Sequence, residues 1–252
     1  MPVKKDKDGQ RSVSAEVEVP GSPEQVWEAI ATGEGISSWF VPSEVDGREG
    51  GTTKTHFGPG MTAVSTITQW NPPRSFTAEA AGESEAEPDN VATEWTVESR
   101  SGDTCVVRVV HRWFADTDDW DDQFEGHAYG WATSFFRMLS LYLEHYPGQE
   151  CTSFQMSAFS ETSAPEAWRK IRDALNIEPQ EDRFAATSGA PESEGEVERL
   201  EITDPDLLRI RESSPHIAAA LDGMDGEESF FHRFVSGHRS QSDDWDHRIS
   251  RR

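Results

Sequence analysis

The stretch SVSAEVEVPGSPEQVWEAI, residues 12–30, predicts a strand that runs directly into a helix. Its first eight residues alternate between polar and apolar side chains, which is the pattern of a strand with one buried face. Gly21 ends the strand, and Ser22 and Gln25 then have the spacing of a capping box, in which each side chain bonds the backbone N–H of the other. Pro23 suits the first helical position, so we expect the helix to begin there.

An apolar stripe on this short helix is formed by Val26, Trp27 and Ile30, and we expect Gly33 and Gly35 to end it. Five further segments are rich in β-branched and aromatic residues between turn signals, and each predicts a strand. These segments are residues 52–57, 62–70, 75–80, 91–99 and 104–114.

The longest helix is predicted over residues 123–145, because its apolar residues recur at intervals of three and four. They are Phe124, Ala128, Trp131, Phe135, Met138 and Tyr142. A strand, a short helix, a run of antiparallel strands and a final long helix indicate the α+β class. In that arrangement one curved antiparallel sheet wraps around the long C-terminal helix.

The order of these elements and several short motifs resemble the helix-grip superfamily, also called SRPBCC or START-like. Residues 12–148 are most similar to its AHSA-type domains, named for activators of a heat-shock chaperone ATPase. The motifs are Ser22–Trp27, Ser38–Phe40, Gly50-Gly51, Trp70–Arg74 and His127–Trp131. The resemblance implies a seven-stranded antiparallel sheet, a gripped helix and an apolar cavity between them. It implies no single activity, since members bind small molecules or chaperones and a few catalyse cyclisation or dehydration.

Residues 151–252 are expected to form a smaller α+β part. The segment TSAPEAW at 162–168 echoes GSPEQVW at 21–27. We therefore predict a truncated repeat of the first domain, with an unrelated appendage as the alternative. The acidic segment 178–196 is expected to be a flexible loop. The strands predicted after this loop cover residues 197–203, 207–211 and 229–235.

Charge excludes several classes of partner. The 252 residues include 47 acidic and 23 basic side chains, for a formal net charge of −24. Phosphate backbones and anionic membranes repel such a chain, so we expect no nucleic-acid and no membrane partner. The sequence shows neither a signal peptide nor an apolar run long enough for a bilayer, which predicts a cytoplasmic location. Lysine is scarce, since it accounts for only 5 of the 23 basic residues. We therefore hypothesise a high-salt cytoplasm, in which salt screens self-repulsion, with an ordinary acidic protein as the alternative.

Aromatic residues dominate the candidate binding site, because small-molecule pockets are concave and largely apolar. The resemblance directs the face of the long helix that carries Trp131 and Phe135 at the cavity. The alternative is that the same rings fill a solid core. The predicted ligand-binding residues are Trp39, Phe40, Trp70, Trp95, His111, Trp113, Trp131, Phe135 and Met138.

Catalytic and metal-binding chemistry have weaker signals. His111 and His127 are the candidates for acid–base work, with Asp116 or Glu125 as a partner. Their spacing matches no known metal-ligand pattern, and the acidic run at 116–122 lacks the glycine and the ligand order of a calcium loop. Neither a GxSxG elbow nor a GxGxxG fingerprint is present. We therefore predict no metal and no cofactor.

Three functions remain. The first is non-enzymatic binding of a small hydrophobic or aromatic molecule in the helix-grip cavity. The second is a stress-related accessory protein that contacts a chaperone, which only the resemblance implies and which needs an exposed apolar patch. The third is a cyclase-like or dehydratase-like enzyme that uses His111, which needs a titratable group facing the cavity.

Overall fold

The structure of the chain is a computed structural model. In its first part it describes residues 3–5, 9–58, 62–81, 90–114 and 121–149. In its second part it describes the backbone of residues 151–160, 183–185, 194–200, 207–212, 217–224 and 229–238. Arg169 and Asp173 are also described, and they are the only residues beyond 149 whose side chains are.

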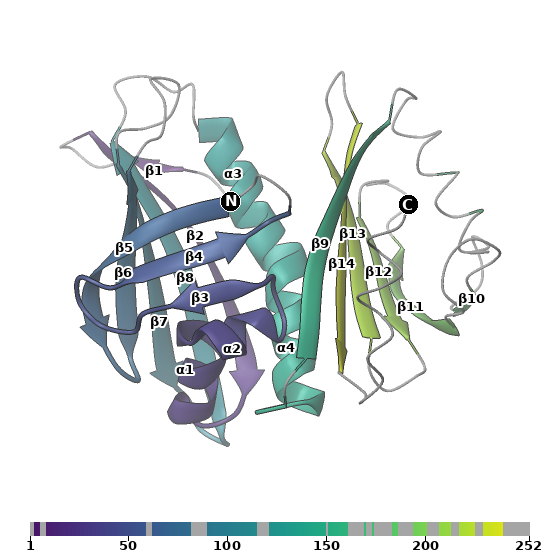
Figure 1. Cartoon of the computed structure of the whole chain (residues 1–252), viewed down its shortest axis with the longest axis horizontal. Coiled ribbons are helices and arrows are strands. Elements are labelled where there is room, and N and C mark those ends of the chain that lie inside the picture. The colour runs from purple at the N-terminus through teal and green to yellow at the C-terminus, as the bar shows by residue number, and fades with distance from the viewer. Residues whose placement is uncertain are drawn as a thin grey trace.

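Eight antiparallel strands form the first sheet, in the order β1-β2-β8-β7-β6-β5-β4-β3 (Figure 1). The strands are β1 (Lys4–Lys5), β2 (Gln10–Pro20), β3 (Ser43–Val45), β4 (Thr52–His56), β5 (Thr62–Asn71), β6 (Ser75–Ala81), β7 (Asn90–Ser99) and β8 (Thr104–Phe114). All five strands predicted between residues 52 and 114 are confirmed, and β2 confirms the alternating first segment. The implied number of seven strands is one too low, because the two-residue β1 pairs with β2 at the edge of the sheet.

The capping box at the start of α1 (Pro23–Ala31) is confirmed. The backbone N–H of Gln25 donates to Ser22 Oγ at 3.3 Å, and the backbone N–H of Ser22 donates to Gln25 Oε1 at 3.0 Å. Two orphan donors of the first turn are thereby satisfied. The predicted stripe residues Val26 and Trp27 are buried, so the helix packs on the sheet by the expected face.

The two glycines after α1 do not end helical structure as expected. After α1 ends, a second short helix, α2 (Gly33–Ser37), follows at once. Thr32 caps it, because its Oγ1 accepts the backbone N–H of Gly35 at 2.9 Å. A Cβ at Gly35 would collide with the backbone carbonyl of Glu28, so the glycine permits α2 to pack closely against α1.

The long helix covers the predicted span but is not a regular α-helix. It consists of α3 (Asp121–Gly130), a π-helical turn (Trp131–Phe135) and α4 (Phe136–His145). Figure 1 shows it running along the length of the first sheet, with α4 at the same end as α1 and α2. None of the helices in the described part of the chain has the length and apolarity that a membrane span requires.

Two separate apolar clusters hold this helix to the sheet. The main core joins α4 residues such as Phe136 and Leu139 to α1 and to strand residues such as Val107. A second group of buried residues, which we call the small cluster, lies under α3. The small cluster consists of Val13, Trp113, Phe124 and Ala128, with Val3 and Val91 packed against it.

A second antiparallel sheet of six strands has the order β10-β11-β12-β13-β14-β9. Its strands are β9 (Cys151–Ser160), β10 (Arg183–Ala185), β11 (Glu194–Leu200), β12 (Leu207–Glu212), β13 (Ile217–Met224) and β14 (Ser229–His238). The expected loop 178–196 is interrupted by β10 and by the start of β11, and β13 was not predicted. The remainder of that loop lies outside the described residues.

Candidate ligand-binding site

The face of β7 and β8 that is turned toward the long helix is apolar except for one threonine, one histidine and one cysteine. Period-two alternation decides which side chains lie on it. On β8 they are Cys105, Val107, Val109, His111 and Trp113. On β7 they are Val91, Thr93, Trp95 and Val97. We call this the inner face. His111 points into the molecule, with its ring centroid 6.4 Å from that of Trp131.

Four aromatic rings from three separate segments meet beside the inner face. Trp131 lies in the π-turn. Its ring centroid is 5.0 Å from that of Trp95 on β7, 5.2 Å from that of Phe40 and 4.9 Å from that of Phe135. Phe40 comes from the connection between α2 and β3 and also contacts Phe135 at 4.8 Å. Several of these pairs are edge-to-face, the geometry that aromatic quadrupoles favour. We call Phe40, Trp95, Trp131 and Phe135 the inner aromatic cluster.

The π-turn explains why the long helix presents so many rings to one place. A turn closed by i→i+5 bonds is wider than an α-helical turn, so residues four and five positions onward both stay near the starting residue. Trp131 accordingly contacts Phe135 at 4.9 Å and Phe136 at 5.6 Å. The regular spacing seen in the sequence predicts only the first of these contacts.

Burial divides the aromatic side chains facing the interior into two groups. Phe136 and Trp113 are 1% and 0% exposed and belong to the packed core. Trp95, Trp131 and Phe135 are only half-buried, although they face the helix or the sheet. These three side chains pack against the main core without being sealed in it.

A polar pair adjoins these rings on the inner face. Thr93 and His111 are cross-strand neighbours, and Thr93 Oγ1 lies 3.0 Å from His111 Nδ1. Both side chains are half-buried. Thr93 was not among the predicted site residues. The alternation that places Trp95 on the inner face places Thr93 there too, so the signal was present in the sequence.

The other predicted ligand-binding residues occupy different places. Trp39 is 2% exposed, and its Nε1 donates to the carbonyl of Ala29 at 2.9 Å. Trp113 stacks on Phe124 with ring centroids 3.9 Å apart. Met138 is buried in the main core. Trp70 is half-buried and packs at the α1 end of the sheet, where its ring lies 5.0 Å from that of Trp27 and 5.6 Å from that of Phe76.

The remaining acid–base candidates do not join His111 in one described group. Asp116 and the side chain of His127 lie outside the described residues. Glu125 accepts the backbone N–H of Val3 at 2.9 Å. Across the residues whose side chains are described, no group of three or more histidine, cysteine or carboxylate side chains is arranged to hold a metal ion. Cys105 is a buried free thiol, and its burial, aided by the charge of Glu24, raises its pKa.

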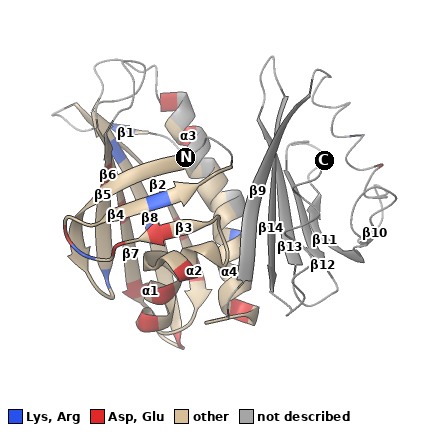
Figure 2. Cartoon of the chain, in the orientation of Figure 1, with Lys and Arg blue, Asp and Glu red and all other residues tan. Residues whose placement is uncertain are grey.

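The outer face of the same strands carries charge. Arg108 pairs with Glu16 at 2.9 Å, and Arg112 pairs with Glu94 at 2.5 Å. Figure 2 shows further acidic residues on α1 and α2, and their side chains are exposed. Within the described part of β7 and β8, the carboxylates are therefore confined to the face away from the long helix.

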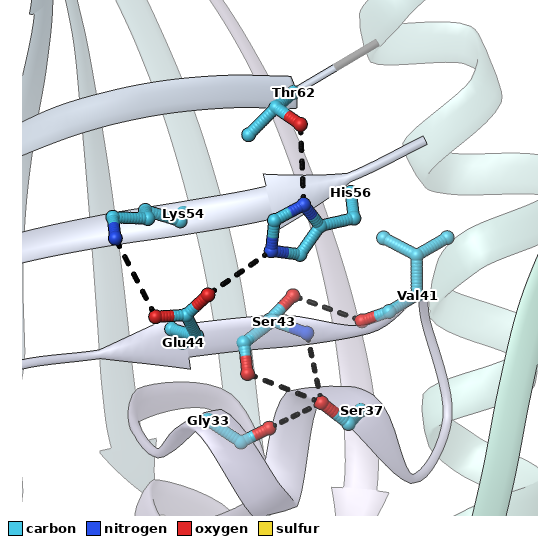
Figure 3. A network of polar contacts seen from close by, with 8 residues as sticks. All are labelled: Gly33, Ser37, Val41, Ser43, Glu44, Lys54, His56 and Thr62. Carbon is cyan, nitrogen blue, oxygen red and sulfur yellow. Dashed lines mark hydrogen bonds and ion pairs between the residues drawn. The ribbon is translucent and has the colours of Figure 1, made fainter. Parts of the chain in front are cut away.

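A polar network joins α2 and the strands β3, β4 and β5 at the β3 edge of the sheet (Figure 3). Ser37 Oγ accepts the backbone N–H of Ser43 at 2.9 Å, which closes the short connection that carries Phe40. On the exposed side, Glu44 Oε1 lies 3.2 Å from His56 Nε2. Hydrogen bonding to His56 and the nearby charge of Lys54 lower the pKa of Glu44.

Comparison with known proteins places the first part of the chain in a family. The sequence model of the family described as activator of Hsp90 ATPase homolog 1-like protein matches residues 20–144. No curated protein sequence matches the chain.

Several solved structures are similar to the chain, all at low sequence identity. Protein MLL2253 from Mesorhizobium loti is 17% identical, with 54% of this chain and 98% of that chain covered and a TM-score of 0.48. Aha1 from Colwellia psychrerythraea, solved as a dimer, is 21% identical, with 53% and 96% covered and a TM-score of 0.43. DynU16, from the dynemicin biosynthetic locus, is 16% identical, with 95% and 91% covered and a TM-score of 0.45.

The family match spans α1, the strands β3 to β8 and nearly all of the long helix, which are the elements that hold the inner aromatic cluster. Residues 20–144 of this chain are therefore a domain of the activator of Hsp90 ATPase homolog 1-like family.

Proposed function

We propose that this domain binds a small, neutral aromatic or hydrophobic molecule between the first sheet and the long helix, without catalysing a reaction. The observation that carries the proposal is the half-burial of Trp95, Trp131 and Phe135 on surfaces that face the interior. Phe136, by contrast, is only 1% exposed and is sealed in the core. Rings that bind a ligand keep accessible surface for it.

Polar groups beside the rings support a ligand with one hydrogen-bonding group. The pair His111 and Thr93 is half-buried at the edge of the inner aromatic cluster. A few polar groups in an apolar surrounding fix the orientation of a ligand.

The charge distribution favours a neutral ligand. The described carboxylates of β7 and β8 lie on the outer face, and the inner face has none. An ionised ligand would have to leave water without an opposite charge on those two strands to pair with, which is costly. The net charge of −24 thus belongs to the solvated shell, where a high-salt cytoplasm would screen it.

The other two functions have less support. Contact with a chaperone, which the family description suggests, calls for an exposed apolar patch. The large apolar side chains exposed in the described part of the chain are Val64 and Phe114, on strands separated by β6 and β7. An enzyme using His111 would need a second acid–base group nearby, and the described inner face of β7 and β8 offers no carboxylate.

The second sheet supports a further proposal, that residues 151–252 are a truncated repeat. In the first sheet β2 pairs with the last strand, β8, and the other strands follow in reverse order. In the second sheet β9 pairs with the last strand, β14, and the others again follow in reverse order, with one strand fewer than the first sheet has when β1 is left out. Arg169 and Asp173 are helical and joined by an i,i+4 ion pair of 2.9 Å, at the place that α1 occupies after β2.

Titration with N-phenyl-1-naphthylamine, a neutral aromatic dye that fluoresces in apolar surroundings, tests the binding proposal. Trp131→Ala removes a ring from the centre of the inner aromatic cluster, so we expect the affinity to fall by about tenfold or more, the worth of one buried large side chain. Phe114→Ala is the control, since it removes an exposed ring from the outer face. Equal affinities of Trp131→Ala and Phe114→Ala would contradict the site. Native mass spectrometry of the purified protein would reveal a co-purified molecule directly.

A further inference from the structure

We propose that α3 is a gate over the ligand site, hinged at the π-turn and latched by the N-terminal segment of the chain. The gate opens while α4 remains packed on the main core. The role in ligand access rests on the proposed function, but the opening itself is a property of the empty protein and is measured without a ligand.

The two halves of the long helix are attached to the sheet very differently. In α4 six of ten residues are buried in the apolar interior. They are Phe136, Met138, Leu139, Leu141, Tyr142 and Leu143. The described apolar side chains that α3 buries are Phe124 and Ala128, and both belong to the small cluster instead of the main core. Among the side chains that the structure describes, α3 thus buries less apolar area than α4, and a smaller buried apolar area lowers the free energy of local opening.

Charged contacts also attach the start of α3 to the sheet. Arg11 Nη1, on β2, donates to Asp121 Oδ1 and Oδ2 at 3.0 Å each. Lys5 Nζ, on β1, lies 2.9 Å from Asp121 Oδ2. The side chains of Arg11 and Asp121 are only 9% and 15% exposed, so water screens this pair far less than it screens the pairs on the outer face. Asp121 is the first residue of α3, where the helix dipole also favours a negative charge.

A second contact extends this latch along α3. The backbone N–H of Val3 donates to Glu125 Oε1 at 2.9 Å, and Val3 packs against the small cluster. Val3, Lys5 and Arg11 therefore connect Asp121 and Glu125 of α3 to β1, β2 and the residue before β1. This is the strand, β1, that the implied seven-stranded sheet did not include.

The hinge coincides with the ligand site. The π-turn Trp131–Phe135 lies where the small cluster gives way to the main core. π-Turns interrupt the regular helical hydrogen bonding and recur at functional positions. The ring centroid of His111 lies 6.5 Å from that of Phe124 in α3 and 6.4 Å from that of Trp131 in the π-turn. Moving α3 away would therefore take Phe124 from His111 and uncover that ring.

Native-state hydrogen exchange of the full chain tests the gate. We expect amides of α3 to exchange at least about tenfold faster than amides of α4, because α3 opens without global unfolding. Leu139→Ala then separates the two processes. It weakens the main core equally in the closed and gate-open states, so exchange in α4 should accelerate while exchange in α3 stays unchanged. If both halves exchange at one rate and accelerate together, the helix opens only by global unfolding and the gate is refuted.

The latch is tested by Asp121→Asn, which removes the charge that pairs with Arg11 and Lys5. We expect α3 amides to exchange at least about tenfold faster in this variant, since it removes the carboxylate from a largely buried ion pair. Glu16→Gln is the matched control, because it breaks a pair with Arg108 on the exposed face of β2. Equal exchange of α3 in both variants would overturn the latch.

Stopped-flow binding of N-phenyl-1-naphthylamine connects the gate to access. We expect the dye to associate several-fold faster with the Asp121→Asn variant than with Glu16→Gln. A dye that binds both variants at equal rates would overturn the access role. A dye that binds neither variant nor the unchanged protein would count against the proposed function, and the exchange experiments would still decide the gate.

Discussion

The two ends of the long helix differ in what holds them to the sheet. The α4 end buries six side chains, five of them in the main core, whereas the described contacts of the α3 end are the small cluster and the polar contacts of Asp121 and Glu125. The proposed ligand site lies at the π-turn, between these two ends of the helix. One continuous helix can thus have a half that stays packed on the sheet and a half that opens, because the ion pairs of α3 can break while the apolar core under α4 stays intact.

The largest effect should come from the fixed end. Leu139 is 0% exposed in the main core, so Leu139→Ala should cost about 2–5 kcal/mol of unfolding free energy through lost burial and a residual cavity. Urea unfolding followed by circular dichroism measures it. Leu139→Met, which keeps the volume, is the control and should cost less than about 1.5 kcal/mol. A loss below that of the control would show that α4 is not the fixed end.

At the α3 end, truncating the larger side chain Phe124 should lower the free energy of unfolding less than truncating Leu139 does. Phe124 stacks on Trp113 at 3.9 Å, and replacing a buried Phe by Ala usually costs about 3–5 kcal/mol. Here the loss cannot exceed the free energy of opening α3, because the opened state no longer makes this contact. We expect about 1–2 kcal/mol for Phe124→Ala in the same urea experiment. A loss equal to or above that of Leu139→Ala would contradict the comparison.

Salt should raise the stability of the folded chain. Self-repulsion at a net charge of −24 is largely screened at 1 M salt, where the Debye length is about 3 Å. We expect the thermal midpoint to rise between 0.1 and 3 M KCl by several degrees, about the shift that 1 kcal/mol produces. A midpoint independent of salt would remove the hypothesis of a high-salt cytoplasm.

The smallest effect is expected at the exposed edge of the sheet. Hydrogen bonding to His56 holds the pKa of Glu44 below its usual 4.5. A lowered carboxyl pKa contributes stability above the unfolded value, and this contribution is lost as the pH falls through the folded value. Glu44→Gln should therefore lower the thermal midpoint slightly at pH 6 and leave it unchanged well below pH 4. A difference that persists in strong acid would mean that the side chain acts through packing.

Much of the fold could be predicted because periodicity reports which face of an element is buried. The alternation before Gly21 and the capping box at Ser22 both appear in the structure as expected. The π-turn could not be predicted, because the residues around Trp131 keep a spacing that a regular helix also satisfies. The edge strand at Lys4 was missed for another reason, since two lysines have no apolar pattern and pair through backbone and charge.

The candidate site was predicted by residue type but not by arrangement. Alternation places Trp95 and His111 on the inner face, and both were candidates. Whether a tryptophan is sealed in the core or half-buried depends on packing between distant segments, so the sequence did not distinguish Trp113 from Trp131. The latch was beyond prediction too, because it joins residues 110 positions apart.

The indole N–H signals of an ¹⁵N-labelled sample test the central claim most directly. On titration with N-phenyl-1-naphthylamine, the signals of Trp95 and Trp131 should shift, because these half-buried rings form the proposed contact surface. The signals of Trp39 and Trp113, which are sealed in the core, should stay in place. Shifts confined to Trp39 and Trp113, or no shift in any of the four, would contradict a ligand site between the sheet and the long helix.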